Sequence, residues 1–265
     1  MSNNAASQAR MAAAARTALG LVDLTSLSDE DSDETIRVLC TRAHTSLGAV
    51  AAVCIYPRFI ATARATLAEN SDPSPVRIAT VVNFPGGGSD IDQAVRETAD
   101  AVAAGADEID LVFPWRTLLD GDEAVGRELV TACRQACPGK VLKVILETGV
   151  LLEPALIRAA AESAIAGGAD FLKTSTGKAP VNATLQAATI LLEYIRDSGQ
   201  DIGFKAAGGI RTTTEAAAYL ALAEQIMGSD WISPAHFRFG ASGLLDDLLT
   251  TLSQPTDSAR PSKGY

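Results

Sequence analysis

The stretch "LEPALIRAAAESAIAGGADFLKTST" (residues 152–176) joins an alanine-rich segment to a short apolar run through Gly-Gly-Ala. Apolar residues recur in its first part at steps of three and four, which is typical of a helix packed on one face. The glycines mark the end of that helix. The run "DFLKTST" (170–176) then predicts a buried strand, and this strand carries a lysine, Lys173.

The same unit of helix and strand recurs along the whole chain. Strands are predicted at residues 20–25, 48–56, 76–84, 107–113, 141–147, 170–176, 202–209 and 237–242, with helical segments such as 89–106 between them. Near-continuous apolar strands separated by helices indicate a parallel sheet covered by helices. Eight such units predict an α/β fold, a single-domain (β/α)8 TIM barrel. A doubly wound open sheet is the alternative on strand rhythm alone.

Composition limits the domain organisation and the partners. No linker divides the chain, so we predict one barrel with an N-terminal helix over residues 1–253 and a flexible polar tail over 254–265. The net charge of −10 argues against nucleic-acid binding, which requires a basic surface. No apolar run is long enough to span a membrane. The N-terminus predicts an exposed helix, with a transit peptide as the alternative. The four cysteines form no Cys-x-x-Cys unit, which favours a reduced, cytoplasmic protein.

Nearly every predicted strand ends in a polar residue. Because the carboxyl ends of barrel strands meet at one face, we expect these side chains to converge on one mouth. The simpler interpretation of Asn83 and Glu147 is a hydrogen-bonding or orienting role. The simpler interpretation of Cys54 is a buried thiol. The converging residues are Asp23, Cys54, Asn83, Asp110, Glu147, Lys173, Lys205 and Ser242.

Two lysines of this set lie on strands predicted to be neighbours. A single lysine such as Lys173 could simply reach solvent where its strand ends. Lys205 on the next strand changes that interpretation, because adjacent strands are only about 4.8 Å apart. Two ammonium groups held that close in a half-buried site repel, so one of them becomes a neutral amine near pH 7. A neutral amine can attack a carbonyl, and Asp110 can balance charge and transfer protons.

Three glycine-bearing loops follow the last three predicted strands. They are "TSTGK" (174–178), "AAGGIRT" (206–212) and "GASG" (240–243), with Lys178 and Arg211 among them. Glycines let backbone N–H groups approach an anion, so we predict a phosphate site here. "NFPGGGSD" (83–90) is interpreted as a loop or lid. His44, in a predicted helix, and His236, in a loop, lack ligand-like spacing, so no metal site is predicted.

Together these motifs resemble the deoxyribose-phosphate aldolase family. The resemblance covers about residues 20–250 and is carried by "LVDLTSL", "VCIYPRFI", "ATVVNFP", "GADEIDLVFPW", "KVILETG", "GADFLKTSTGK", "GFKAAGGIRT" and "RFGASGLLDDLL". It implies a barrel that splits 2-deoxy-D-ribose 5-phosphate reversibly into acetaldehyde and D-glyceraldehyde 3-phosphate, without a cofactor. It also implies a small-molecule phosphosugar as the substrate and, as in many members, a homodimer. Two departures are Gly243, where a serine is expected in the phosphate loop, and Ala206, where proline is common.

The resemblance implies a role for each candidate residue. Lys173 would form the Schiff base, Lys205 would lower its pKa, and Asp110 would take part in proton relay. Tyr265, at the end of the tail, either is incidental or reaches the mouth as a further proton relay. The predicted substrate contacts are Asp23, Thr25, Cys54, Thr176, Gly177, Lys178, Gly208, Gly209, Ile210, Arg211, Gly240 and Ser242. The competing hypotheses are another phosphosugar barrel, such as an isomerase or a transaldolase-like enzyme, and a barrel that binds phosphate without catalysis.

Overall fold

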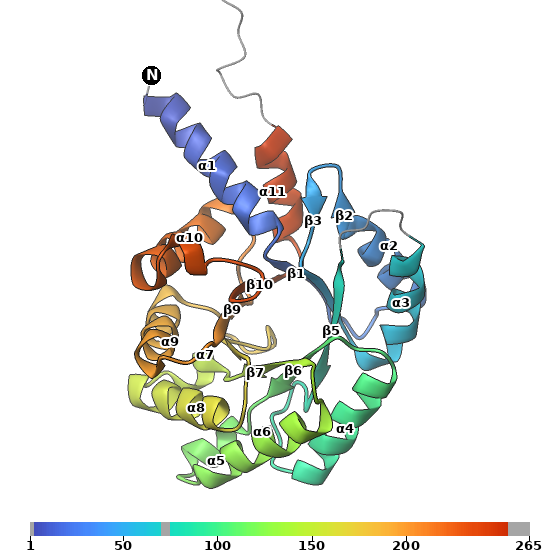
Figure 1. Ribbon diagram of the computed structural model, residues 1–265, viewed down its shortest axis with the longest axis vertical. Coiled ribbons are helices and arrows are strands. Elements are labelled where there is room, and N and C mark those ends of the chain that lie inside the picture. Colours follow the sequence, from blue (N-terminus) through green and yellow to red (C-terminus); the bar gives the residue numbers. More distant parts are fainter. Residues whose placement is uncertain (1–2, 70–74, 254–265) are drawn as a thin grey trace, which may run out of the picture.

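Eight parallel strands close into a barrel, as the sequence predicted (Figure 1). The computed structural model describes residues 3–69 and 75–253, with side chains from residue 6. Around the barrel the strand order is β1-β10-β9-β8-β7-β6-β5-β4. The barrel strands are β1 (Val22–Ser26), β4 (Ala52–Ile55), β5 (Arg77–Val82), β6 (Glu108–Val112), β7 (Val141–Ile145), β8 (Phe171–Lys173), β9 (Gly203–Ala207) and β10 (Phe237–Ala241).

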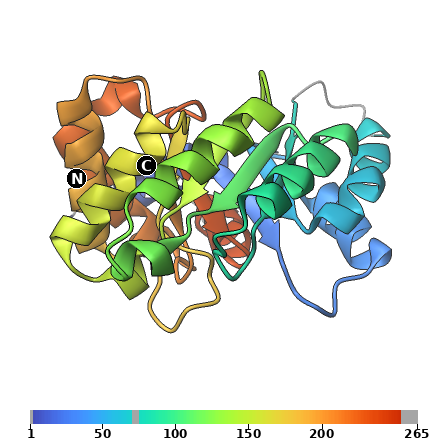
Figure 2. The same cartoon turned by 90° about the horizontal axis from the view of Figure 1, so that it is seen from below.

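Helices surround the barrel, and their apolar faces cover the strands (Figures 1 and 2). At one side α1 packs against α10 and α11, so the first and last described helices lie together. The helices are α1 (Asn3–Leu19), α2 (Asp33–Arg42), α3 (Ile60–Ala68), α4 (Ile91–Ala103), α5 (Trp115–Leu119), α6 (Ala124–Ala136), α7 (Thr148–Leu151), α8 (Pro154–Ala166), α9 (Leu185–Ser198), α10 (Thr213–Met227) and α11 (Leu244–Ser253), with 3-10 turns η1 (Pro57–Phe59) and η2 (Ser229–Trp231). In the described part of the chain, none of the helices is long and apolar enough to cross a bilayer.

Local sequence signals fix where the helices begin and end. Asp90 and Thr184 cap α4 and α9, because each side chain accepts a hydrogen bond from a backbone N–H of the first turn. Thr212 and Glu215 form a reciprocal capping box at the start of α10. These caps fix the residue at which each loop at the barrel mouth ends and its helix begins.

The predicted second strand is interrupted. Residues 48–56 were expected to be continuous, but β2 (His44–Thr45) and β3 (Gly48–Ala49) form a separate antiparallel hairpin, and β4 starts at Ala52. Gly48, the first residue of β3, has a φ of 132°, a backbone angle that favours glycine, directly after the turn that joins β2 to β3. His44 therefore lies in this hairpin and not in a helix.

The polar loops emerge at the carboxyl ends of the strands. Figure 2 shows the long loops after β1 and β8 projecting from the same edge of the barrel. The predicted boundary at 253/254 stays a prediction, because residues 254–265 lie outside the described ranges.

Candidate active site

Lys173, Lys205 and Asp110 meet inside the barrel. Lys173 and Lys205 are register partners on the adjacent strands β8 and β9. Both Nζ atoms donate to the same oxygen, Oδ2 of Asp110 on β6, at 2.7 Å each. All three side chains are buried, Lys173 at 3% exposure and the other two fully. A single carboxylate oxygen thus serves two cations away from solvent.

Asp23 and Arg238 continue this arrangement toward β1 and β10. The Asp23 carboxylate accepts from Lys205 at 2.5 Å through Oδ2 and from Arg238 at 2.7 Å through Oδ1. Arg238 is the register partner of Lys205, so three cations run side by side across β10, β9 and β8. The two aspartates lie against this row and separate its charges.

Lys143 and Glu108 complete the group, and the sequence reasoning missed both. Nζ of Lys143 on β7 lies 2.8 Å from Asp110 Oδ1 and 2.6 Å from Glu108 Oε2. Glu108 also binds the Arg238 guanidinium at 3.0 Å. The sequence signal that could have identified Lys143 is a charged residue within an apolar strand, as in "VLKVILE" (141–147). We call Asp23, Glu108, Asp110, Lys143, Lys173, Lys205 and Arg238 the interior charge cluster.

The two lysines on β8 and β9 differ in proton affinity. Burial lowers the pKa of Lys173, Asp110 opposes this effect, and Lys205 lowers it further, so the pKa lies below the ordinary lysine value. Burial also acts to lower the pKa of Lys205, but Asp110 and Asp23 together raise it above the ordinary value. Burial would raise the pKa of Asp110, yet the three neighbouring lysines hold it well below the usual range. Lys173 is therefore the lysine that releases its proton most readily.

A pocket of about 240 Å³ opens above Lys173. Ten of the predicted substrate contacts line it together with Lys173, Leu27, Ala207 and Ala241; the ten are Thr25, Thr176, Gly177, Lys178, Gly208, Gly209, Ile210, Arg211, Gly240 and Ser242. The three glycine loops and Lys173 thus face one space. It is small and polar enough for a compact anionic substrate.

The loop after β8 is fixed by a buried carboxylate. Glu147 lies just beyond β7 with a φ of 58°, and its Oε2 accepts from the Thr176 hydroxyl at 2.6 Å. The Thr176 hydroxyl oxygen in turn accepts from the backbone N–H of Lys178 at 3.0 Å. Lys178 Nζ donates to the carbonyl of Leu27 at 2.8 Å, bridging the loops after β8 and β1. Glu147 therefore orients the loop after β8 at the barrel mouth, which agrees with the orienting role predicted for it.

Two glycines of the loop after β9 have backbone angles that side chains rarely adopt. The φ values are 85° at Gly208 and 87° at Gly209. A Cβ atom at Gly208 would lie 2.7 Å from Asn182 Cβ, whereas one at Gly209 would meet nothing within 4 Å. Gly240 on β10 leaves room for Lys205, since a Cβ there would lie 3.0 Å from Lys205 Cε.

Other predicted residues lie away from the pocket. Asp23, Asp110 and Lys205 sit within their strands, inside the barrel and below the pocket, and not at the strand ends as expected. Cys54 is buried with its Sγ 3.9 Å from Asp110 Oδ2, and burial raises the pKa of its thiol. Neither Asp23 nor Cys54 lines the pocket, and Tyr265 lies outside the described residues.

Asn83 orients the loop after β5. Its side-chain N–H groups donate to the carbonyls of Gly88 and Val112 at 2.8 and 3.0 Å, and its Oδ1 accepts from the Gly88 N–H. This ties residues 83–88 to the barrel wall, and none of them lines the pocket above Lys173. Among the described side chains, no group of three or more His, Cys, Asp or Glu is arranged to hold a metal ion.

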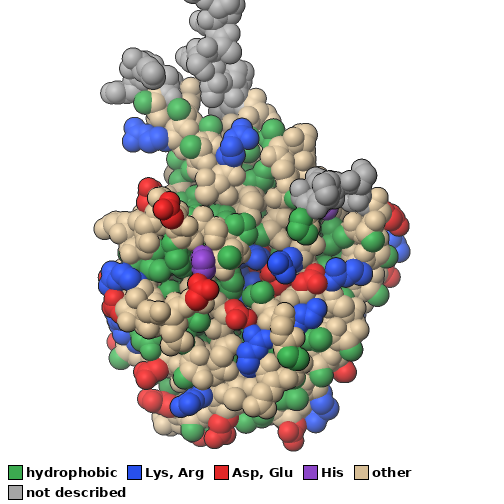
Figure 3. Space-filling view, in the orientation of Figure 1, with side chains coloured by type: hydrophobic (Ala, Val, Ile, Leu, Met, Phe, Trp, Pro, Cys, Tyr) green, Lys and Arg blue, Asp and Glu red, His purple; other side chains and the backbone are tan. Residues whose placement is uncertain are grey.

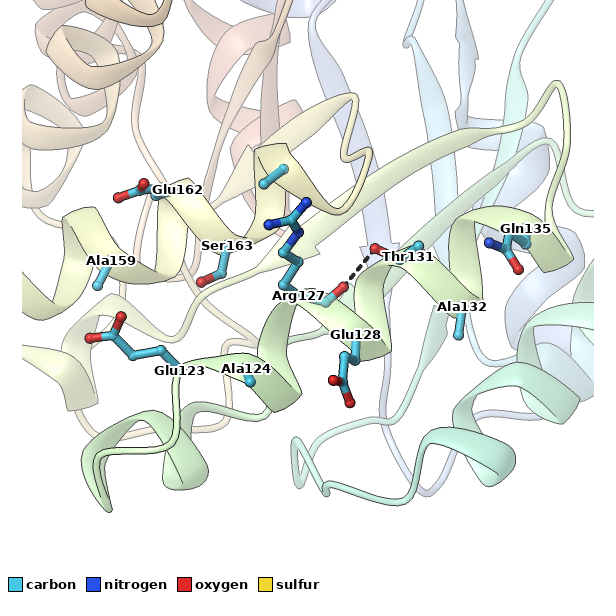
Figure 4. A pocket seen from close by; sticks show the side chains of 11 residues that line it. Glu123, Ala124, Arg127, Glu128, Thr131, Ala132, Gln135, Ala159, Glu162 and Ser163 are labelled. Carbon is cyan, nitrogen blue, oxygen red and sulfur yellow. Dashed lines mark hydrogen bonds between the residues drawn. The ribbon is translucent and has the colours of Figure 1, made fainter.

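Two larger hollows lie elsewhere. A groove of about 830 Å³ runs on the outer surface between α6 and α8, lined by polar and alanine side chains (Figure 4). A second, of about 750 Å³, lies at the amino ends of the strands, where Arg238 and Glu108 form part of its lining. On the face seen in Figure 3, acidic and basic side chains are intermixed. Only the 240 Å³ pocket reaches Lys173 among these three.

The sequence model of DeoC/LacD family aldolases matches residues 17–247. The chain belongs to this aldolase family. A solved structure from Toxoplasma gondii ME49, whose own assignment as a deoxyribose-phosphate aldolase is provisional, superposes with a TM-score of 0.85 at 28% identity, over 92% of this chain and 96% of that one. A protein of the same provisional assignment from Coccidioides immitis has a TM-score of 0.77 at 28% identity, covering 89% and 86%.

A third solved structure shares the fold of this aldolase. The deoxyribose-phosphate aldolase of Aeropyrum pernix, described as a tetramer, superposes with a TM-score of 0.72 at 22% identity, over 96% of this chain and 99% of that one. These similarities confirm the resemblance that the sequence motifs indicated. The protein is accordingly an aldolase, a carbon–carbon lyase by class.

Proposed function

We propose that this aldolase cleaves 2-deoxy-D-ribose 5-phosphate reversibly into D-glyceraldehyde 3-phosphate and acetaldehyde, through a Schiff base on Lys173. The observation that carries the proposal is the shared oxygen of Asp110, which binds both Lys173 and Lys205 beneath the pocket. Lys205 has a second carboxylate, Asp23, whereas the only carboxylate within ion-pair distance of Lys173, among described residues, is Asp110. Lys173 is the lysine that can be neutral, and it lines the pocket.

The chemistry requires an electron sink, because cleavage of an unactivated C–C bond would leave a carbanion. Lys173 Nζ attacks the C1 aldehyde, and loss of water from the carbinolamine gives an iminium ion. A base removes the 3-hydroxyl proton, and the C2–C3 bond breaks as its electrons form an enamine on Lys173. D-glyceraldehyde 3-phosphate leaves, the enamine is protonated at C2, and hydrolysis of the iminium releases acetaldehyde.

Asp110 and Lys205 are the proposed proton-transfer pair. Neither lines the pocket, so the proton passes between this pair and the substrate through one water molecule. Asp110 is held ionised by three lysines and Lys205 is held protonated by two carboxylates, which supplies a base and an acid side by side. Removal of either group should therefore reduce both cleavage and enamine protonation.

The 5-phosphate is proposed to bind at the glycine loops. Gly208, Gly209 and Ser242 are the proposed phosphate contacts at the end of the pocket, with Lys178 adding positive charge. The backbone N–H of Gly208 would have to release the carbonyl of Gly240, to which it donates at 3.4 Å. Lys178 would have to release the carbonyl of Leu27, to which it donates in this structure. Gly243 carries no hydroxyl, so it cannot make the side-chain hydrogen bond to phosphate that a serine in its place would offer.

Three further expectations stay predictions. The A. pernix enzyme is described as a tetramer, while the family resemblance implies a homodimer for this chain. Sedimentation velocity measures the oligomeric state directly. Cytoplasmic location is tested by cell fractionation. The proton-relay role of Tyr265 is tested by NMR in D2O: Tyr265→Phe should slow exchange at the acetaldehyde methyl while Schiff-base formation persists.

A coupled assay tests the proposed reaction. The purified enzyme and deoxyribose 5-phosphate should release glyceraldehyde 3-phosphate, detected by a dehydrogenase that consumes it, and acetaldehyde in equal amount. Lys173→Met should abolish both products. Ribose 5-phosphate serves as a substrate control, because its 2-hydroxyl occupies the carbon that becomes the enamine. No cleavage of the deoxy sugar at any pH between 6 and 9, by a folded protein, would reject the proposal.

A further inference from the structure

The interior charge cluster holds four cations and three carboxylates. The cations are Lys143, Lys173, Lys205 and Arg238, and the carboxylates are Asp23, Glu108 and Asp110, none more than 3% exposed. Such a buried set is stable only when its charges compensate one another, because water is excluded. If all seven groups are ionised, one positive charge is left over. If one cation is neutral, the set balances.

The contacts decide which cation is neutral. Lys143 lies within 3.5 Å of three carboxylates, and Lys205 and Arg238 each lie within 3.2 Å of two. Lys173 contacts one, and shares that oxygen with Lys205. Glu147 is also buried, but its carboxylate is engaged by Thr176 and makes no ion pair among the described residues. Arg77 lies 3.7 Å from Glu108 and is half exposed, so solvent compensates it.

We propose that Lys143, Glu108 and Arg238 are positioning residues whose fixed buried charges select Lys173 as the one group of the cluster that gives up its proton. This inference rests on the proposed function for its meaning in catalysis. Lys143 and Arg238 neutralise all three carboxylates together with Lys205, which leaves no unshared negative charge for Lys173. The state of the nucleophile is thus set from the amino-terminal half of the barrel, away from the pocket.

The groups that act on Lys173, directly or through another group, come from six strands. Asp110 on β6 and Lys205 on β9 are direct neighbours, and Cys54 on β4 contacts the same Asp110 oxygen. Lys143 on β7 and Asp23 on β1 act one contact further away, through Asp110 and Lys205. Glu108 and Arg238 act through these in turn. A change of charge at Glu108 or Lys143 therefore reaches Lys173 without altering a residue that lines the pocket.

Opposite charge changes should have opposite effects. Lys143→Met leaves three carboxylates and three cations, which balance only with Lys173 protonated, so its pKa should rise by about one unit or more. Glu108→Gln removes a negative charge at nearly constant shape, so the pKa of Lys173 should fall. The double variant removes one charge of each sign and should return the pKa close to that of the parent. A purely structural role predicts no such pattern of signs.

Competitive labelling measures this pKa independently of aldolase activity. The full-length protein and its variants are treated with trace acetic anhydride between pH 6 and 11, and acetylation of Lys173 is quantified by peptide mass spectrometry. A rise in Lys143→Met, a fall in Glu108→Gln and restoration in the double variant are expected. If Lys143→Met does not fold, Glu108→Gln decides alone. An unchanged pKa, or two shifts of the same sign, overturns the inference. Acetaldehyde trapping on the same proteins tests the proposed function separately.

Discussion

Lys173 and Lys205 are cross-strand register partners, and their Nζ atoms lie at the same distance, 2.7 Å, from one oxygen of Asp110. Lys205 also lies 2.5 Å from Asp23, so its charge has a second partner. This difference separates two residues of identical type on neighbouring strands. It makes Lys173 the nucleophile in the proposed reaction and Lys205 the fixed positive charge beside it.

Replacing Lys205 should move the working pH of the enzyme. In Lys205→Met, the Asp110 carboxylate interacts with Lys143 and Lys173 only, and the positive charge beside Lys173 is removed. The pKa of Lys173 should therefore rise by about 1–3 units. The neutral amine is the reactive form, so its fraction at pH 7 should fall roughly tenfold for each unit. The acid limb of kcat/KM should shift to alkaline pH, and activity should recover only in part, because the proton relay is lost as well. An acid limb at the parental pH would contradict this account.

Lys178 should matter for the phosphate and not for the aldehyde. Loss of one charge-assisted hydrogen bond in Lys178→Ala should raise KM for deoxyribose 5-phosphate roughly 10- to 100-fold. Cleavage of unphosphorylated deoxyribose should be nearly unaffected. Lys140→Ala is the matched control, since Lys140 lines the hollow at the opposite end of the barrel. Equal losses on both sugars would remove Lys178 from the phosphate site.

The two glycines after β9 should differ in their tolerance of a methyl group. Gly209→Ala places alanine at a φ of 87° in open space, which should cost about 1–2 kcal/mol of unfolding free energy. Gly208→Ala adds a clash with Asn182, 2.7 Å from the new Cβ, and should cost a further 1–3 kcal/mol or so. Urea unfolding measures both. Equal costs would show that Asn182 moves aside freely.

Asp23 should make the fold sensitive to acid. Burial would raise the pKa of Asp23, but Lys205, Lys143 and Arg238 hold it below its unfolded value. Its charged form therefore stabilises the fold above about pH 4, and this contribution is lost as the pH falls further. Asp23→Asn should cost about 3–5 kcal/mol at pH 7, because it leaves buried cations uncompensated. Its stability should also fall less steeply below pH 4 than that of the parent.

Urea unfolding between pH 3 and 7 checks this prediction. The exposed Asp92, in the first turn of α4, provides the control, and Asp92→Asn should change the stability by about 0.5 kcal/mol or less. An equal cost for Asp23→Asn and Asp92→Asn would show that the interior charge cluster does not depend on Asp23.

The barrel and the lysine pair could be predicted because both depend on order along the chain. Successive parallel strands are neighbours in a barrel, so lysines in consecutive strands had to approach each other. The glycine loops followed from the same rule. How deep each polar side chain lies in the barrel did not follow from this rule, because strand register and tilt decide whether a residue faces the mouth or the interior. The sequence pattern predicts Asp23 at the end of its strand. In the structure it lies below the pocket instead, where it binds Lys205 and Arg238.

Lys143, Glu108 and Arg238 escaped prediction for a related reason. Each lies in an apolar strand, where a charged residue needs charged partners inside the barrel, and those partners lie on neighbouring strands or across the barrel interior. Lys143 and Glu108 are 35 positions apart and Glu108 and Arg238 are 130 apart, yet they meet inside the barrel. The sheet closes between β1 and β10, and this closure places Arg238 beside Asp23.

Trapping of the Schiff base tests the central claim most directly. The protein is incubated with acetaldehyde, reduced with borohydride and digested, and the modified lysine is located by mass spectrometry. We predict one ethyl group per chain, on Lys173, and its loss in Lys173→Met, while the folded Lys178→Ala control is labelled like the parent. An adduct on Lys205 or Lys143, or none on Lys173 at any pH between 7 and 9, would contradict the account.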